Sequence, residues 1–90
     1  MAGEKILIID DEYEIIEFVQ FYLQKENYEV ISAQSGKEGL EKARIEKPSL
    51  IILDIMLPDV DGVELCLQLR RESNVPILFL SCKSEDIDKA

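Results

Sequence analysis

Short apolar runs alternate with segments whose apolar residues recur at helical spacing, and this alternation restricts the fold more than any other feature of the sequence. Branched apolar residues fill the runs at 5–9, 50–53 and 76–80, which is typical of strands buried on both faces. The run at 28–33 alternates more and indicates a strand nearer a sheet edge. Amphipathic patterns after the first three strands predict three helices.

This strand–helix order predicts an α/β domain with a doubly wound parallel sheet, helices on both faces and right-handed crossovers. We expect the strand order 2-1-3-4. The chain has 90 residues, 47% of them hydrophobic, which suits one small core. No internal repeat or Gly/Ser-rich linker divides it, so we expect one domain.

Local signals predict the helix ends. Ser35 and Glu38 have the spacing of a capping box at the start of the second helix, and Pro48 closes that helix. Asn27 is a plausible end for the first helix. Ser84 predicts the N-cap of a fourth helix that the sequence leaves unfinished.

Charge and residue types exclude several classes of function. The net charge of −9 disfavours direct binding of nucleic acid or anionic membranes. The chain has no histidine, which excludes histidine-based catalytic sets and metal sites. No apolar run approaches the roughly 20 residues of a membrane span, and no signal segment opens the chain. Cys66 and Cys82 lack CxxC spacing and suit a reducing compartment, so we expect a cytoplasmic protein.

Carboxylates end two of the predicted strands: Asp10 and Asp11 follow the first strand, and Asp54 follows the third. In a doubly wound sheet the working crevice lies at the carboxyl ends of the strands, where strand order reverses. That point lies between the first and third strands, so the three carboxylates should converge. Neighbouring carboxylates repel one another, and a hard cation would offset this repulsion. Mg²⁺ suits a carboxylate site without histidine.

A rim of carboxylates at the carboxyl ends of the strands predicts phosphoryl chemistry. With Mg²⁺ bound, one carboxylate can act as a nucleophile toward a phosphoryl group and form an aspartyl phosphate. Ser81, at the end of the fourth strand, is the hydroxyl donor expected on the same rim. Each residue also has a structural reading: Asp11 as a helix N-cap, Ser81 as a loop residue and Asp54 as a turn former. Their joint occurrence at three strand ends favours the functional reading.

Asp59 and Asp61 are predicted to have structural roles. Asp59 follows Pro58 and Asp61 precedes Gly62, which is ordinary turn and helix-start chemistry. An alternative takes residues 59–63 as the DxDxV nucleophile motif of haloacid-dehalogenase-like phosphohydrolases. That motif should directly follow a strand, whereas a proline-containing loop intervenes here.

Three segments resemble a known family: IIDDE at 8–12, LIILDIMLPDVDG at 50–62 and PILFLSCKSE at 76–85. In this order, and through essentially the whole chain, they are similar to the receiver domain of bacterial two-component response regulators. The resemblance implies a flavodoxin-like sheet and a phosphoryl-accepting signalling switch.

The resemblance also implies site residues and partners. Asp54 would be the phosphoacceptor, and it would hold Mg²⁺ together with Asp10, Asp11 and the backbone carbonyl of Met56. Ser81 would be the switch hydroxyl. A sensor histidine kinase would be the phosphodonor, docking partly on the first helix, and the switch would control an output domain, transcriptional in kind, that is not in this sequence. The chain's own chemistry would be at most self-catalysed phosphotransfer and autodephosphorylation.

The family continues through a complete fourth helix, a fifth strand and a fifth helix, so residues 1–90 are expected to be a C-terminally incomplete receiver domain. The family's phosphate-binding lysine and aromatic switch residue on the fifth strand have no counterpart, and Lys83 resembles a solvated lysine. Two readings therefore stay open beside a working switch: impaired phosphorylation and an inert fragment. The fourth strand would be an uncovered apolar edge, which predicts a homodimer or a domain swap.

Overall fold

The computed structural model describes residues 3–80, which form four strands and three helices in alternating order. The elements are β1 (Lys5–Ile9), α1 (Tyr13–Lys25), β2 (Glu29–Ala33), α2 (Gly36–Glu46), β3 (Leu50–Asp54), α3 (Gly62–Glu72) and β4 (Ile77–Leu80). The predicted alternation is confirmed. The N-cap expected at Ser84 lies outside the described residues.

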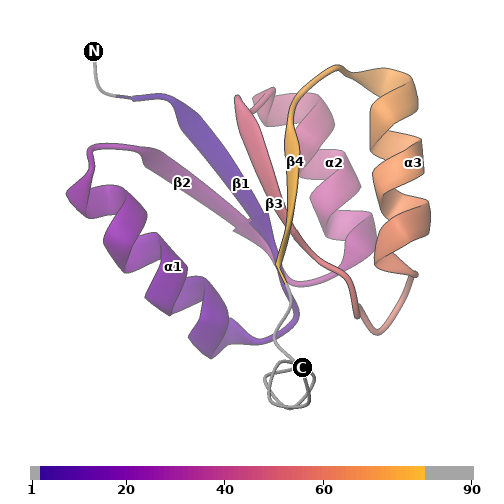
Figure 1. The fold of residues 1–90 in the computed structure, drawn as a ribbon, viewed down its shortest axis with the longest axis horizontal. Coiled ribbons are helices and arrows are strands. Elements are labelled where there is room, and N and C mark those ends of the chain that lie inside the picture. The colour runs from indigo at the N-terminus through magenta and orange to yellow at the C-terminus, as the bar shows by residue number, and fades with distance from the viewer. Residues whose placement is uncertain (1–2, 81–90) are drawn as a thin grey trace, which may run out of the picture.

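The four strands form one parallel sheet in the order β2-β1-β3-β4. Figure 1 shows α1 on one face of this sheet and α2 with α3 on the other. The expected doubly wound fold and strand order are therefore confirmed. The carboxyl ends of the strands lie at the lower edge of the sheet in this view, and the order of connection reverses between β1 and β3.

The core has one layer on each side of the sheet because successive strand residues point to opposite faces. The layer beneath α2 and α3 contains seven buried residues: Leu7, Ile9, Ala33, Ile51, Leu53, Leu65 and Leu69. The layer beneath α1 contains four: Ile6, Ile8, Ile16 and Ile52. Both faces of β1 and β3 are thus covered, which explains why these strands are almost continuously apolar.

The N-terminus of α2 has the predicted cap. The Ser35 hydroxyl accepts a hydrogen bond from the Glu38 backbone N–H at 3.1 Å. The Glu38 carboxylate accepts one from the N–H of Gln34 at 3.0 Å, one residue earlier than in a standard capping box. The helix ends at Glu46, and its C-cap is Lys47, which has a left-handed φ of 50° and directly precedes Pro48. Sequence signals therefore located both ends of α2.

The apolar run of β4 indicates a strand buried on both faces, but the described residues show the uncovered edge that was also expected for the fourth strand. Among residues 3–80 it pairs only with β3, and it forms an edge of the sheet. The Leu78 and Phe79 side chains are 57% and 43% exposed. A continuous apolar run predicts burial, but it does not reveal what covers each face.

Within the described range, no helix combines the length and apolar composition needed to cross a membrane.

Candidate functional site

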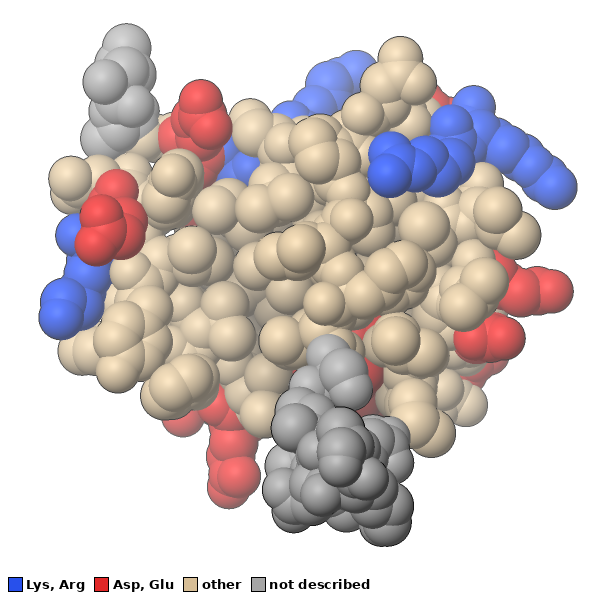
Figure 2. Space-filling view, viewed as in Figure 1, with Lys and Arg blue, Asp and Glu red and all other residues tan. Residues whose placement is uncertain are grey.

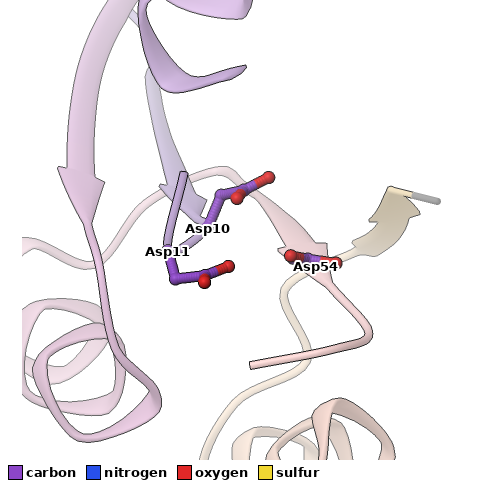
Figure 3. Close-up of side chains that lie close together, drawn as sticks. All are labelled: Asp10, Asp11 and Asp54. Atoms are coloured by element: carbon purple, nitrogen blue, oxygen red, sulfur yellow. The ribbon is translucent and has the colours of Figure 1, made fainter. Parts of the chain in front are cut away.

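The ends of β1 and β3 bring three carboxylates together. Asp10 directly follows β1, Asp54 is the last residue of β3, and Ile9 pairs with Leu53 in the parallel register. Asp10 and Asp54 therefore occupy the next position on two neighbouring strands, and Asp11 follows in the chain. One carboxylate oxygen from each of the three aspartates lies within 4.8 Å of the other two. Figure 3 shows the Asp10 and Asp11 carboxylates pointing toward Asp54.

The three carboxylates have different environments. Asp10 is fully buried and Asp54 is 6% exposed, whereas Asp11 is exposed. Burial raises the pKa of Asp10 to about 6. The backbone N–H of Glu12, which donates to Asp10 Oδ1 at 2.8 Å, opposes this rise in pKa, and the negative charges of Asp54 and Asp11 add to it. The site therefore holds a buried carboxylate beside two further acidic groups, an arrangement that a bound cation would stabilise.

The loop after β3 is held close to the site. The backbone N–H of Met56 donates to Asp54 Oδ1 at 3.1 Å, which orients the Asp54 carboxylate. Met56 also forms an isolated antiparallel bridge with Asp61, and the Gly62 N–H donates to the Ile55 carbonyl at 2.9 Å. A Cβ atom on Gly62 would lie 2.6 Å from the Ile55 backbone, so this close approach requires glycine.

The site is open to solvent on one side. A hollow of about 510 Å³ adjoins it, lined by Asp11, Ile55, Met56, Leu57, Pro58 and Asp61. On the face shown in Figure 2, the Lys and Arg side chains lie mainly along the upper edge, away from the lower edge where acidic side chains are visible. A phosphate-bearing donor would therefore need a cation at the site to offset the repulsion.

The structure confirms that Asp10, Asp11 and Asp54 meet, as the sequence predicted. The N-cap of α1 is Glu12, so the alternative role of Asp11 as that cap is wrong. Ser81 lies outside the described residues. The Met56 backbone is part of the site through its N–H, and its carbonyl stays a predicted metal ligand.

Asp59 and Asp61 both serve helix N-termini. Asp61 caps α3, and its Oδ1 accepts from the Val63 N–H at 3.1 Å, as the sequence predicted. Asp59 instead accepts from Gly36 and Lys37 at the start of α2. Neither belongs to the carboxylate group around Asp54. The simple turn role expected for Asp59 was therefore incomplete, and no local pattern indicates its partners, because they lie 22 and 23 residues earlier.

The oxygen atoms at this site fit Mg²⁺, which prefers one or two carboxylates completed by further oxygen ligands. No nitrogen or sulfur ligand contributes among the residues of the group. A carboxylate positioned beside a bound cation can act as a nucleophile toward phosphorus. The arrangement is thus chemically suited to Mg²⁺-assisted phosphoryl transfer.

Comparison with known proteins agrees with this chemistry. The family model of the response regulator receiver domain matches residues 6–90. The alkaline phosphatase synthesis transcriptional regulatory protein PhoP of Bacillus subtilis is 49% identical over 88 residues, which are 97% of this chain and 37% of PhoP. The response regulator ArlR of Staphylococcus saprophyticus is 44% identical over 85 residues, 94% of this chain and 39% of ArlR. The chain thus spans less than two fifths of each of these relatives.

Solved structures are similar in fold as well as sequence. The response regulator TrrA of Thermotoga maritima, solved in complex with Mg²⁺-BeF, is 35% identical with a TM-score of 0.84, over 94% of this chain and 73% of that one. The BeF₃-activated receiver domain of RstA from Klebsiella pneumoniae is 38% identical with a TM-score of 0.82, over 86% and 66%. Receiver domains bind Mg²⁺ at an aspartate cluster and are phosphorylated by histidine kinases. With its parallel 2-1-3-4 sheet and its acidic group at the strand ends, this chain belongs to the receiver domain family of two-component response regulators.

Proposed function

We propose that this chain is a Mg²⁺-dependent phosphoryl-accepting switch and that Asp54 is its phosphoacceptor. The observation that carries the proposal is the convergence of the Asp10, Asp11 and Asp54 carboxylates within 4.8 Å at the carboxyl ends of β1 and β3. Asp10 is fully buried, which disfavours attack on an external donor. Asp54 is slightly exposed, and the Met56 N–H holds one of its oxygens, which leaves the other for attack.

The carboxylates of Asp10, Asp11 and Asp54 and the carbonyl of Met56 would hold the metal. A bound Mg²⁺ ion would neutralise negative charge on the phosphoryl oxygens and on the acidic group. The raised pKa of Asp10 supports this assignment, because it reflects the unfavourable free energy of keeping this carboxylate ionised without a cation.

In the proposed reaction, a free oxygen of Asp54 attacks the phosphorus of a phosphohistidine on a sensor histidine kinase. A P–O bond forms and the P–N bond breaks, so the electron pair stays on the imidazole nitrogen. The product is an aspartyl phosphate on Asp54. Ser81 would be the switch hydroxyl, and in support it directly follows Leu80, which pairs with Asp54 in the β3–β4 register.

The named relatives suggest the output. One is described as a transcriptional regulatory protein and another as a response regulator, so we propose that residues 1–90 act as a receiver domain that controls a transcriptional output module. The net charge of −9 disfavours direct binding of nucleic acid by residues 1–90, which supports a regulatory role for them rather than a DNA-binding one. The TrrA complex with Mg²⁺-BeF supports the proposed metal and the phosphoryl chemistry by similarity.

Self-association is a further part of the proposal. Along β4, Leu78 and Phe79 are exposed on an edge strand, and a second copy could pair with that edge or exchange an element across it.

Phosphodonor labelling tests the function. The protein is incubated with acetyl phosphate and Mg²⁺, and its intact mass is measured. We expect one added phosphoryl group on the wild-type protein, and none after Asp54→Asn or with EDTA. Asp61→Asn is the matched control: asparagine is an equally good N-cap, so α3 is preserved and labelling should continue.

Equal labelling of Asp54→Asn would overturn the assignment. Labelling that disappears with Asp59→Asn but not with Asp54→Asn would instead favour the phosphohydrolase reading. Absence of labelling in the wild-type protein would favour impaired phosphorylation if Mg²⁺ still raises its thermal stability, and the inert-fragment reading if Mg²⁺ does not.

A further inference from the structure

The carboxylate of Asp59 joins the loop after β3 to the first turn of α2. Its Oδ1 accepts from the Gly36 N–H at 2.9 Å, and its Oδ2 accepts from the Lys37 N–H at 3.1 Å. Helices begin with backbone N–H groups that have no partner within the helix. Asp59 therefore provides acceptors for two of these groups from a distant part of the chain.

Together with the local cap, Asp59 completes this helix end. The Glu38 N–H donates to Ser35 Oγ, and the Gly39 N–H donates to the Ser35 carbonyl. All of the first four N–H groups of α2 thus have acceptors, two of them on Asp59. The helix dipole favours an anion at this position, and the hydrogen bond from Gly36 is the largest cause of the lowered pKa of Asp59.

The side chain of Val60, next to Asp59, packs at the same contact between the loop and α2. A Cβ atom built on Gly36 would overlap Cγ1 of Val60, so Val60 lies directly against the glycine. Val60 also packs against the buried layer beneath α2 and α3. Hydrogen bonds from Asp59 and packing of Val60 therefore fasten the loop to α2 at adjacent positions.

This loop is the one that carries Met56. On its far side it is tied to α3 through Asp61 and through the bond from Gly62 to Ile55. Its middle is tied to α2 through Asp59. Loops on a protein surface are mobile unless anchored, and a metal ligand must be held within a fraction of an ångström to bind well.

We propose that Asp59 is a positioning residue, which fixes the loop carrying Met56 by capping α2 and so holds the metal site in its binding geometry. The inference rests on the proposed function, because it requires that Asp10, Asp11, Asp54 and the Met56 carbonyl bind Mg²⁺. Asp59 itself has no part in coordinating the ion. Its effect reaches the site through the backbone between residues 56 and 59.

The test compares Asp59→Ala with Ser35→Ala. Asp59→Ala removes two hydrogen-bond acceptors from the N-terminus of α2 and Ser35→Ala removes one, but only Asp59→Ala breaks the hydrogen bonds between the loop and the helix. Mg²⁺ titrations followed by ¹H–¹⁵N spectra give the dissociation constant for Mg²⁺. The spectrum recorded before metal is added shows whether the backbone amides of the loop keep their wild-type environment. We expect Asp59→Ala to weaken Mg²⁺ binding about tenfold, and Ser35→Ala to leave it within about twofold of wild type.

The metal-free spectra provide a second readout. Asp59→Ala should shift the amide signals of Met56 and Gly62, and Ser35→Ala should leave both in place. Asp59→Asn retains one oxygen acceptor and should weaken Mg²⁺ binding by an intermediate factor. If the Asp59→Ala variant does not fold, the Mg²⁺ affinity of Asp59→Asn is compared with that of the wild type instead.

Equal Mg²⁺ affinities for the Asp59→Ala and Ser35→Ala variants would overturn the positioning role and leave the proposed function standing. An Asp59→Asn variant with the wild-type affinity would do the same. A wild-type protein that binds no Mg²⁺ would overturn the proposed function, and the inference with it, so the two failures can be distinguished.

Discussion

Among single residues, Asp10 shows most clearly how the fold holds an acidic site at the expense of stability. Burial is the main cause of its pKa of about 6, compared with an ordinary value of 3.8. Between these two pH values the folded protein binds more protons than the unfolded chain, so the free energy of unfolding falls as pH rises. Ionised Asp10 therefore destabilises the metal-free protein above about pH 6, and this effect vanishes below about pH 4.

Asp10→Asn should remove this destabilisation. Asparagine keeps the oxygen that accepts from the Glu12 N–H. In EDTA, we expect the variant to be more stable than wild type by about 1–3 kcal/mol near pH 8, with a smaller difference near pH 5. Urea unfolding followed by circular dichroism at both pH values measures this. Glu17→Gln is the control, because it removes an exposed negative charge that is not among the causes of the raised pKa of Asp10. A difference independent of pH, or a variant less stable near pH 8, would contradict this account.

The residues differ in how far the sequence could predict their roles. Asp10 and Asp54 were predictable because each directly follows a run of apolar residues typical of a strand, and because parallel strands place their carboxyl ends at one edge. Asp59 was not predictable in this way. Its partners are the N–H groups of Gly36 and Lys37, and only the tertiary packing of the loop against α2 brings them near.

At the scale of elements, the packing of α2 on β1 depends on a glycine. A Cβ atom at Gly39 would lie 2.5 Å from Cδ1 and 2.7 Å from Cγ1 of Ile9, which is fully buried. Ile9 is β-branched and has little rotamer freedom to move away. The helix can therefore approach the sheet this closely only without a side chain at residue 39.

Gly39→Ala should destabilise the protein. Alanine favours a helix by about 1 kcal/mol over glycine, but we expect overpacking against Ile9 to outweigh that gain and to leave a net loss of about 1–3 kcal/mol. Glu41→Ala, on the exposed side of the same helix, should change stability by less than about 0.5 kcal/mol. Urea unfolding of both variants measures the difference. Higher stability in Gly39→Ala would mean that α2 is free to move outward.

Element boundaries were largely predictable because their signals are local. Ser35 marked the start of α2, Pro48 marked its end, and Asp61 marked the start of α3. The apolar run of β4 alone did not predict its exposure, since burial depends on which other elements cover a strand; its place at an uncovered edge was predicted only through the family resemblance. Its composition matches that of β3, yet among residues 3–80 β4 lies at the sheet edge.

At the level of the whole molecule, the edge strand β4 is a surface suited to association among residues 3–80. Its edge offers backbone groups for pairing, and Leu78 is 57% exposed beside it. We expect multi-angle light scattering at micromolar concentration to give a mass above that of a monomer. Leu78→Lys should restore the monomer, because a lysine on an edge strand opposes pairing.

Phe18→Lys is the control, since Phe18 is 63% exposed on α1, a helix that contacts β2 at the opposite edge of the sheet from β4. This variant should associate as wild type does. A compact wild-type monomer would contradict self-association. Association that persists in Leu78→Lys but is lost in Phe18→Lys would place the contact on α1.

The proposed switch depends on the three converging carboxylates forming a phosphoryl-accepting site with Asp54 as the acceptor. The most direct measurement labels the protein with acetyl phosphate and Mg²⁺, reduces it with borohydride, and locates the modified residue by peptide mass spectrometry. Borohydride converts an aspartyl phosphate into homoserine, so the position is recorded permanently. We predict homoserine at residue 54 alone, and only when Mg²⁺ is present. Homoserine at Asp59 or Asp61, modification without Mg²⁺, or no modification at all would contradict the claim.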